Sequence, residues 1–175
     1  MNNVSILKLL TLTASVCLAM PPAWAQSDTV ASASAEILPG MNEAPIHNAA
    51  RTGSRQDVEQ FLQASSQNRD TRTPLGASPL HYAAMNADSG PLKALLAAGA
   101  NPNGRDGDGR TALHMAAFST RKNNAMLLLK AGADPLIKTN DGRDVLSMAR
   151  KVRADEIAGE ISLWILKGCK PGKVC

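Results

Sequence analysis

Aromatic residues are scarce in this chain, since phenylalanine, tyrosine and tryptophan together make up 3% of its 175 residues. This scarcity excludes a core built on large rings, so alanine and leucine must supply the buried surface through close helix packing. The basic excess is small, with a formal net charge of +4 at pH 7 and no long basic run. Its densest clusters, Arg121-Lys122 and Arg150–Arg153, have the size of ordinary solvated helix faces. The charge therefore does not predict binding to nucleic acid.

Motifs of several enzyme classes are missing as well. The sequence contains no Gly-x-Ser-x-Gly nucleophile turn, no glycine-rich phosphate loop and no His-Glu-x-x-His zinc motif. No nucleophile stands beside a recognisable base. We therefore predict a protein that is not an enzyme and needs no cofactor.

The first 25 residues have the pattern of a secretory signal. Lys8 precedes an apolar run, Leu9–Met20, and Pro21–Ala25 ends in an Ala-x-Ala cleavage site. The run is too short to span a membrane comfortably, and it ends in prolines. We expect cleavage after Ala25 and a periplasmic product that has no contact with the membrane. Residues 26–43 are rich in serine and alanine without a clear period, which indicates a flexible leader.

One stretch recurs along the rest of the chain at a fixed spacing. Its clearest copy is Gly109–Ala117 (GRTALHMAA), with Gly76–Ala84 thirty-three residues earlier and Gly142–Ala149 thirty-three residues later. A weaker copy, Ala44–Ala50, places its histidine thirty-four residues before that of the next copy. A constant period of this length is the sequence sign of a stacked repeat.

The residues of each copy explain why it folds. In Ser78-Pro79 the serine can cap a helix, and the proline occupies the first helical position, where no N–H is needed. Leucine and paired alanines then follow at helical spacing, and Gly99 suits the left-handed stop of a second helix. The turn-forming residues of Asn101–Arg110 predict a finger between repeats. Neither helix can bury its apolar stripe alone, so neighbouring repeats must cover it.

The recurring stretch resembles the T-P-L-H-x-A-A segment of the ankyrin repeat. Leu95–Asn103 and Leu128–Pro135 resemble the L-L-x-x-G-A-D/N-x-N segment of the same family, and the resemblance covers about 44–166. It implies an all-α ankyrin-repeat solenoid of helix-turn-helix units joined by β-hairpin-like fingers. We place the repeats at about 44–72, 73–105, 106–138 and 139–167. The chain departs from the family after Phe61-Leu62, where the Gly-Ala-Asp/Asn segment is missing, so the first finger should be irregular.

The three histidines suggest a metal site, but their spacing argues against one. His47, His81 and His114 occupy equivalent positions on stacked helices about 10 Å apart, whereas zinc ligands lie about 2 Å from one ion. The resemblance implies that each histidine braces a finger against a helix, with Ser147 at that position in the last repeat. The oxygen-rich segment that starts at Asn101 resembles a calcium loop only faintly, because its twelfth residue is alanine instead of glutamate. We predict no metal.

The C-terminal tail, 168–175, carries two cysteines, Cys169 and Cys175, around a Pro-Gly turn. In an oxidising compartment they should form a small disulfide-closed loop, worth roughly 2–3 kcal/mol on the chain-entropy model. The alternative is a thiol or redox pair, which is a weaker hypothesis because reactive disulfides usually lie at helix starts.

Ankyrin repeats bind other proteins through their finger tips and the exposed face of each first helix, so the resemblance implies the same here. Phe118 either forms an interface hot spot or folds onto its own repeat, and the sequence leaves both open. We predict a monomer that binds another protein in the periplasm on its concave side, with a redox protein or a secreted host-directed effector as alternatives. The residues carried over as partner-binding are Met85, Asn86, Arg105, Asp108, Arg110, Phe118, Ser119, Lys138, Asn140 and Arg143.

Overall fold

The computed structural model describes residues 43–169, which belong to one compact unit. The predicted signal peptide, nearly all of the predicted leader and Cys175 lie outside the described residues. Within 43–169, no helix has the length and the apolar character needed to cross a membrane.

Eight α-helices follow one another in pairs through the described residues, and a short 3-10 helix, η1, follows the second of them. The described part contains no β-strand. The elements are α1 (Pro45–Thr52), α2 (Arg55–Ala64), η1 (Ser66–Asp70), α3 (Pro79–Met85), α4 (Gly90–Ala97), α5 (Ala112–Phe118), α6 (Lys122–Lys130), α7 (Val145–Lys151) and α8 (Asp155–Leu166).

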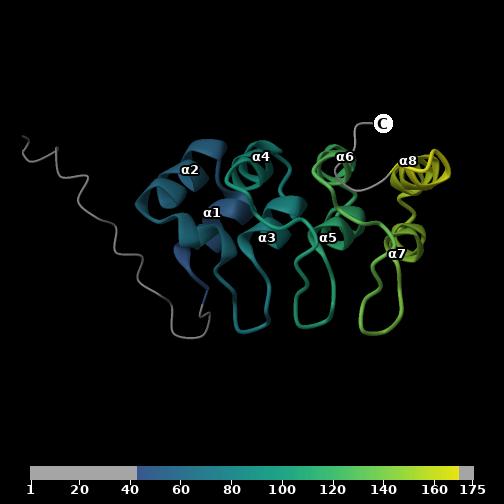
Figure 1. Ribbon diagram of the computed structural model, residues 1–175, viewed down its shortest axis with the longest axis horizontal. Helices are drawn as coiled ribbons and strands as arrows, with labels where there is room; N and C mark the ends of the chain where they lie inside the picture. Colours follow the sequence, from purple (N-terminus) through teal and green to yellow (C-terminus); the bar gives the residue numbers. More distant parts are fainter. Residues whose placement is uncertain (1–42, 170–175) are drawn as a thin grey trace, which may run out of the picture. The chain divides into compact units, whose positions relative to one another are not determined.

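The helices form two rows. The first helices of the pairs, α1, α3, α5 and α7, lie side by side in one row, and α2, α4, α6 and α8 form the second (Figure 1). Long fingers project beyond the row of first helices. Each finger closes with a hairpin-like bond, from the N–H of Thr73, Asp106 or Thr139 to the carbonyl four residues later, at 2.8–2.9 Å. The predicted all-α ankyrin-repeat solenoid is confirmed.

Local chemistry sets the ends of the helices. Gly99 has a φ of 82°, and the N–H of Ala100 bonds back to the Leu95 carbonyl at 3.0 Å, which closes α4 with a Schellman motif. Gly132, with a φ of 96°, ends α6 in the same way. The left-handed stop expected at Gly99 is therefore present, and its recurrence at Gly132 turns the second and third repeats toward their next fingers.

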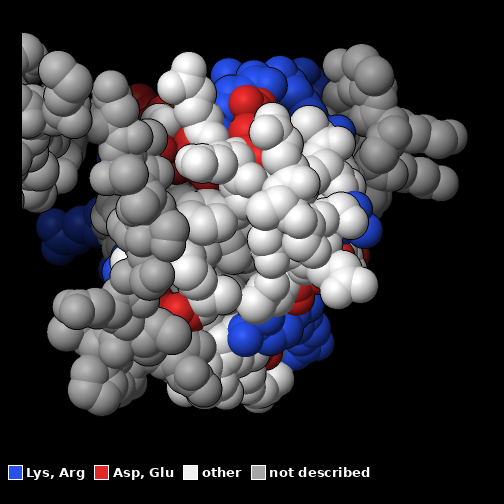
Figure 2. All heavy atoms as spheres, turned by 90° about the vertical axis from the view of Figure 1, so that its left-hand side faces the viewer, with Lys and Arg blue, Asp and Glu red and all other residues white. Residues whose placement is uncertain are grey.

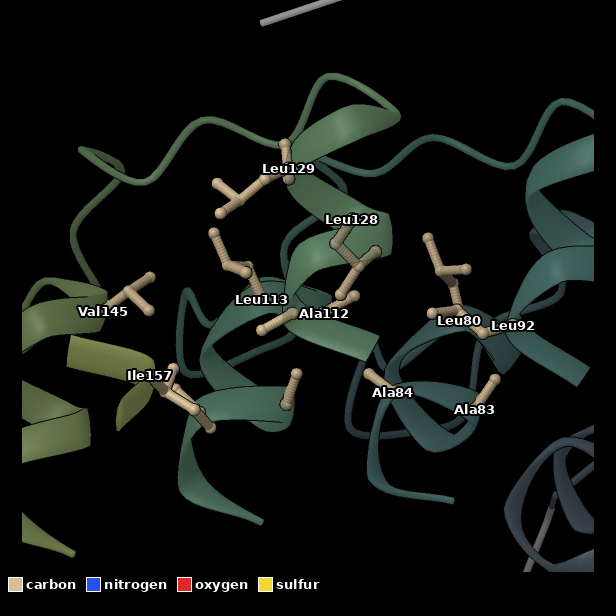
Figure 3. Packing of buried hydrophobic residues seen from close by; sticks show 14 of the residues in the cluster. Leu80, Ala83, Ala84, Leu92, Ala112, Leu113, Leu128, Leu129, Val145 and Ile157 are labelled. Carbon is tan, nitrogen blue, oxygen red and sulfur yellow. The ribbon is translucent and has the colours of Figure 1, made fainter. Parts of the chain in front are cut away.

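Alanine and leucine fill the space between the rows. Ala84 and Ala117 have no exposed surface, so neighbouring first helices approach closely at these positions. Figure 3 shows Leu113 of α5 and Leu128 of α6 pointing into the space between their helices, and both are fully buried. Burying one such leucine stabilises the fold by about 1.5–3 kcal/mol.

The two end repeats deviate from the regular pattern. In the first, η1 occupies the place of the missing glycine-alanine segment, and Arg69 donates a hydrogen bond to the Ala98 carbonyl at 2.7 Å. In the last, Trp164 lies inward and is 7% exposed. The exposed face of α8 is partly apolar, since Leu163 and Leu166 are 52% and 81% exposed.

Candidate functional site

Buried histidines fix the fingers to the first helices. The Ser78 N–H donates to Nδ1 of His81 at 3.1 Å, so the ring proton lies on Nε2, which donates to the Arg110 carbonyl of the next finger at 3.1 Å. His47 also brings Nε2 to 3.0 Å from a carbonyl, that of Thr71, but its Nδ1 faces the Ala44 carbonyl at 3.1 Å instead of an N–H. The repeat therefore uses these rings as structural braces.

In His114, as in His81, Nδ1 accepts a hydrogen bond from the backbone N–H of the helix-capping residue, which is Thr111 here, at 3.2 Å. Its Nε2 has no partner within hydrogen-bonding distance in 43–169, although the Arg143 carbonyl is close enough to raise the pKa of the ring. Burial outweighs that effect and lowers the pKa of His114, and it lowers the pKa of His81 as well. In the last repeat Asp144 caps α7 by accepting from the Ser147 N–H at 2.7 Å, so a carboxylate stands where Ser78 and Thr111 cap the earlier helices, and Ser147 occupies the histidine position.

Adjacent fingers are bonded to each other. The Gly107 N–H donates to the Leu75 carbonyl at 2.8 Å, and the Asn140 N–H donates to the Asp108 carbonyl at 2.9 Å. The Asn140 side chain adds a bond from Nδ2 to the Gly107 carbonyl at 2.9 Å and accepts from Arg105 at 3.0 Å. These bonds hold the finger tips at a fixed distance from one another.

In the finger that starts at Asn101, side-chain oxygens accept hydrogen bonds from backbone N–H groups of the finger's own turns. Asn101 Oδ1 accepts from the Asn103 N–H at 2.9 Å, and Asp106 Oδ1 accepts from the N–H groups of Asp108 and Arg110 at 3.0 and 2.8 Å. Among the described residues, no group of three or more histidine, cysteine, aspartate or glutamate side chains could hold a metal ion.

A hollow of about 530 Å³ lies between the fingers and the first helices. Leu75 at a finger tip is 78% exposed and lines it. The helical side is apolar, with Tyr82 and Met85 from α3 and Met115 from α5, whereas Asp108 belongs to the finger side. The Tyr82 hydroxyl donates to Glu43 at 2.6 Å, and burial together with that bond raises its pKa to about 12.

A second hollow, of about 160 Å³, adjoins the first and shares Arg110 and Met115 with it. Its apolar lining comes from Met115 and Phe118 of α5 and Met148 of α7, and Phe118 is 56% exposed. Its charged lining comes from Arg110, Arg143 and Lys151. The two hollows together are called the groove below, and the second is called the Phe118 hollow.

The two hollows differ in charge. Asp106 and Asp108 line the first, whereas no acidic residue lines the Phe118 hollow. Arg110 pairs with Asp108 at 3.1 Å and Arg143 with Asp141 at 3.0 Å, each within its own finger. The Thr139 hydroxyl, and to a lesser extent Arg143, lowers the pKa of Asp141. Lys151 has no ion-pair partner in the described part of the chain.

Figure 2 shows the end of the described residues formed by α1 and α2, where basic and acidic side chains are interspersed among uncharged ones. That face carries no continuous field of one sign.

The structure brings together five of the ten residues predicted to bind a partner. Met85, Asp108, Arg110, Phe118 and Arg143 all line the groove. Among the other lining residues, sequence reasoning did not assign a binding role to four that lie on the first helices. Tyr82, Met115 and Met148 each follow the histidine position of their repeat, and Lys151 is the repeat equivalent of Met85 and Phe118. The repeat period could have revealed all four.

The other five predicted residues do not line either hollow. Asn86 is 8% exposed and donates to the Ala50 and Gly53 carbonyls at 3.1 Å, which ties its repeat to the previous one. Arg105 and Asn140 are exposed and bond to each other across the fingers. The remaining two are the half-buried Ser119, which caps α5, and the exposed Lys138.

The cysteine tail is described only at its start. Cys169 packs partly buried against the core, and its N–H donates to the Trp164 carbonyl at 3.3 Å. Cys175 lies outside the described residues, so the disulfide between the two stays a prediction.

Paired helices, bonded fingers and histidine braces define a solenoid of ankyrin type. The family model described as ankyrin repeats (3 copies) matches residues 41–149. The chain therefore belongs to the ankyrin-repeat family. No curated protein matches it in sequence. Ankyrin repeats in general mediate interactions between proteins and are typically not enzymes.

Proposed function

We propose that this protein is exported to the periplasm and binds another protein in the groove, without catalysing a reaction. The observation that carries the proposal is the apolar lining of the groove, which side chains of α3, α5 and α7 form. Phe118, Met85 and Met115 contribute to it, and charged fingers border it. A central aromatic side chain surrounded by arginines is typical of interface hot spots.

The fingers support the proposal in a second way. Because they are bonded to one another and braced by buried histidines, the groove is formed before a partner arrives. A preformed surface loses little conformational entropy on binding, so more of the contact energy is available for affinity.

The experiment compares capture of proteins by the full chain and by two variants, each made with its own N-terminal sequence and a C-terminal tag. Phe118→Ala should reduce affinity for the captured protein by tenfold or more, as is common for a central aromatic. Leu136→Ala is the matched control, because Leu136 is 63% exposed but lines neither hollow. Equal capture by both variants would place the interface elsewhere.

Export is tested separately. Cell fractionation should recover the protein from the periplasm, and N-terminal sequencing should begin at Gln26. An uncleaved chain in the cytoplasm would contradict this part of the proposal and leave the groove experiment unaffected.

A further inference from the structure

The Phe118 hollow differs from the rest of the groove in size and charge. Its volume of about 160 Å³ compares with the roughly 150 Å³ cavity that holds a benzene molecule in an engineered protein. It therefore has room for one phenyl-sized side chain, whereas the neighbouring hollow of about 530 Å³ could take several residues.

The apolar lining fits such a side chain. Met115 and Met148 come from adjacent first helices, and Phe118 stands between the fingers and α7 with 56% of its surface exposed. Thioethers adapt their shape to an aromatic ring and make favourable contacts with it. An aromatic anchor of a partner would thus meet two methionines and one phenylalanine.

The border of the hollow is cationic. Arg110, Arg143 and Lys151 line it, and no carboxylate does. The two arginines are partly neutralised by their own fingers, through Asp108 and Asp141, and Lys151 lacks an ion-pair partner within 43–169. The hollow therefore keeps a net positive charge that a partner can neutralise.

Resting on the proposed function, we propose that the Phe118 hollow receives a phenylalanine-like side chain flanked by carboxylates, from an acidic peptide segment of the partner. Arg110, Arg143 and Lys151 bind the flanking carboxylates, while Phe118, Met115 and Met148 enclose the ring. The segment continues over the larger hollow, where Asp106 and Asp108 favour uncharged or basic residues. The groove thus sets the direction in which the segment runs.

The test uses four synthetic nine-residue peptides and the full chain labelled with ¹³C at its methionine methyl groups. One peptide carries a central phenylalanine with two glutamates on each side, the second replaces the glutamates with glutamine, the third replaces them with lysine, and the fourth replaces the phenylalanine with alanine. The methyl signals of Met115 and Met148 report on the hollow. Met126 is the internal control, because it lies on α6 outside the groove.

We expect the acidic phenylalanine peptide to bind about tenfold more tightly than the glutamine peptide, because up to three exposed ion pairs, each weak by itself, are lost together. This advantage should shrink as salt increases. Lys151→Gln should weaken binding of the acidic peptide about two- to fivefold. Arg150→Gln should not, since Arg150 is exposed on the same helix but lines neither hollow.

Two results would overturn the inference. If the glutamine or lysine peptide binds as tightly as the acidic one, the cations do not select the partner. If the alanine peptide binds equally well, or only Met126 shifts, the hollow holds no aromatic anchor. Should none of the peptides bind while capture of the partner still depends on Phe118, the inference fails but the proposed function stands.

Discussion

Two glycines in successive fingers provide a matched test of the bonding between fingers. Gly109 and Gly142 have left-handed φ angles of 76° and 78° at the same position of their fingers. A Cβ added to Gly142 would meet no atom within 4 Å. A Cβ added to Gly109 would lie 2.9 Å from the Asn140 backbone N, and it would clash with the Asn140 and Arg105 side chains. Replacing either glycine with alanine carries the same cost of a left-handed backbone, and the two substitutions differ only in the atoms that surround the added methyl group.

The magnitudes follow from this difference. A left-handed alanine costs about 1–2 kcal/mol, and restriction of the unfolded chain offsets about 0.4–1 kcal/mol of that cost. Gly142→Ala should therefore destabilise the fold by about 1 kcal/mol. Gly109→Ala should also displace Asn140, whose bonds to the Asp108 and Gly107 carbonyls are both 2.9 Å long. Each bond is worth about 0.5–1.5 kcal/mol, so the extra destabilisation should be about 1–3 kcal/mol.

Urea unfolding followed by far-ultraviolet circular dichroism measures both variants against the unmodified chain. The midpoint for Gly109→Ala should fall well below that for Gly142→Ala, with similar slopes, because the surface exposed on unfolding is unchanged. Equal midpoints would refute the reasoning, since they would mean that the bonds between fingers add nothing to stability.

Other predictions concern single side chains. Gly159 lies exposed within α8 with no atom within 4 Å of an added Cβ, so Gly159→Ala should stabilise the fold by about 0.5–1 kcal/mol in the same urea assay. Burial lowers the pKa of His81 and His114, so the folded state favours the neutral rings. Stability should be full above pH 6.5, the unfolded value, and fall as the pH drops below it. His114→Gln should flatten this fall in urea titrations at several pH values, and an unchanged slope would contradict the assignment. Tyr82 is the only tyrosine of the chain, and its ultraviolet titration should have a midpoint near pH 12 while circular dichroism still reports a folded chain. Glu43→Gln should lower that midpoint.

Much of the fold could be predicted because the repeat places each residue type where its local chemistry is needed. Ser78-Pro79 starts a helix and Gly99 ends one wherever the surrounding structure permits, and the structure has both. The outer face of α8 could not be predicted in full, since Leu163 fits a helix equally well whether it points inward or outward. Only the packing of α8 on its neighbours decides that orientation.

The candidate site was predicted only in part, because the sequence does not show which side chains bond to a neighbouring repeat. Sequence alone placed Asn86 on the binding surface because it follows paired alanines, but its carboxamide bonds to the Ala50 and Gly53 carbonyls. A short polar side chain at a helix end can bond to backbone or to a partner, and the choice depends on which carbonyls the previous repeat leaves open. Phe118, which the sequence left undecided, is more than half exposed and lines the groove.

The repeat spacing that places the packing residues of the first helices also places the side chains that line the groove. In each first helix, the positions that pack against neighbours hold small or aliphatic residues, and the first three repeats carry a buried histidine beside the finger. From the second repeat onward, the side chains one and four residues after the histidine position line the groove, and they differ from repeat to repeat. Along the chain the first series reads Asn48, Tyr82, Met115 and Met148, and the second reads Arg51, Met85, Phe118 and Lys151. Both series are polar in the first repeat and apolar in the middle two, and the second ends in a lysine. The apolar residues of the middle repeats and the lysine that follows them match the aromatic anchor and the flanking carboxylate of the partner segment proposed for the groove.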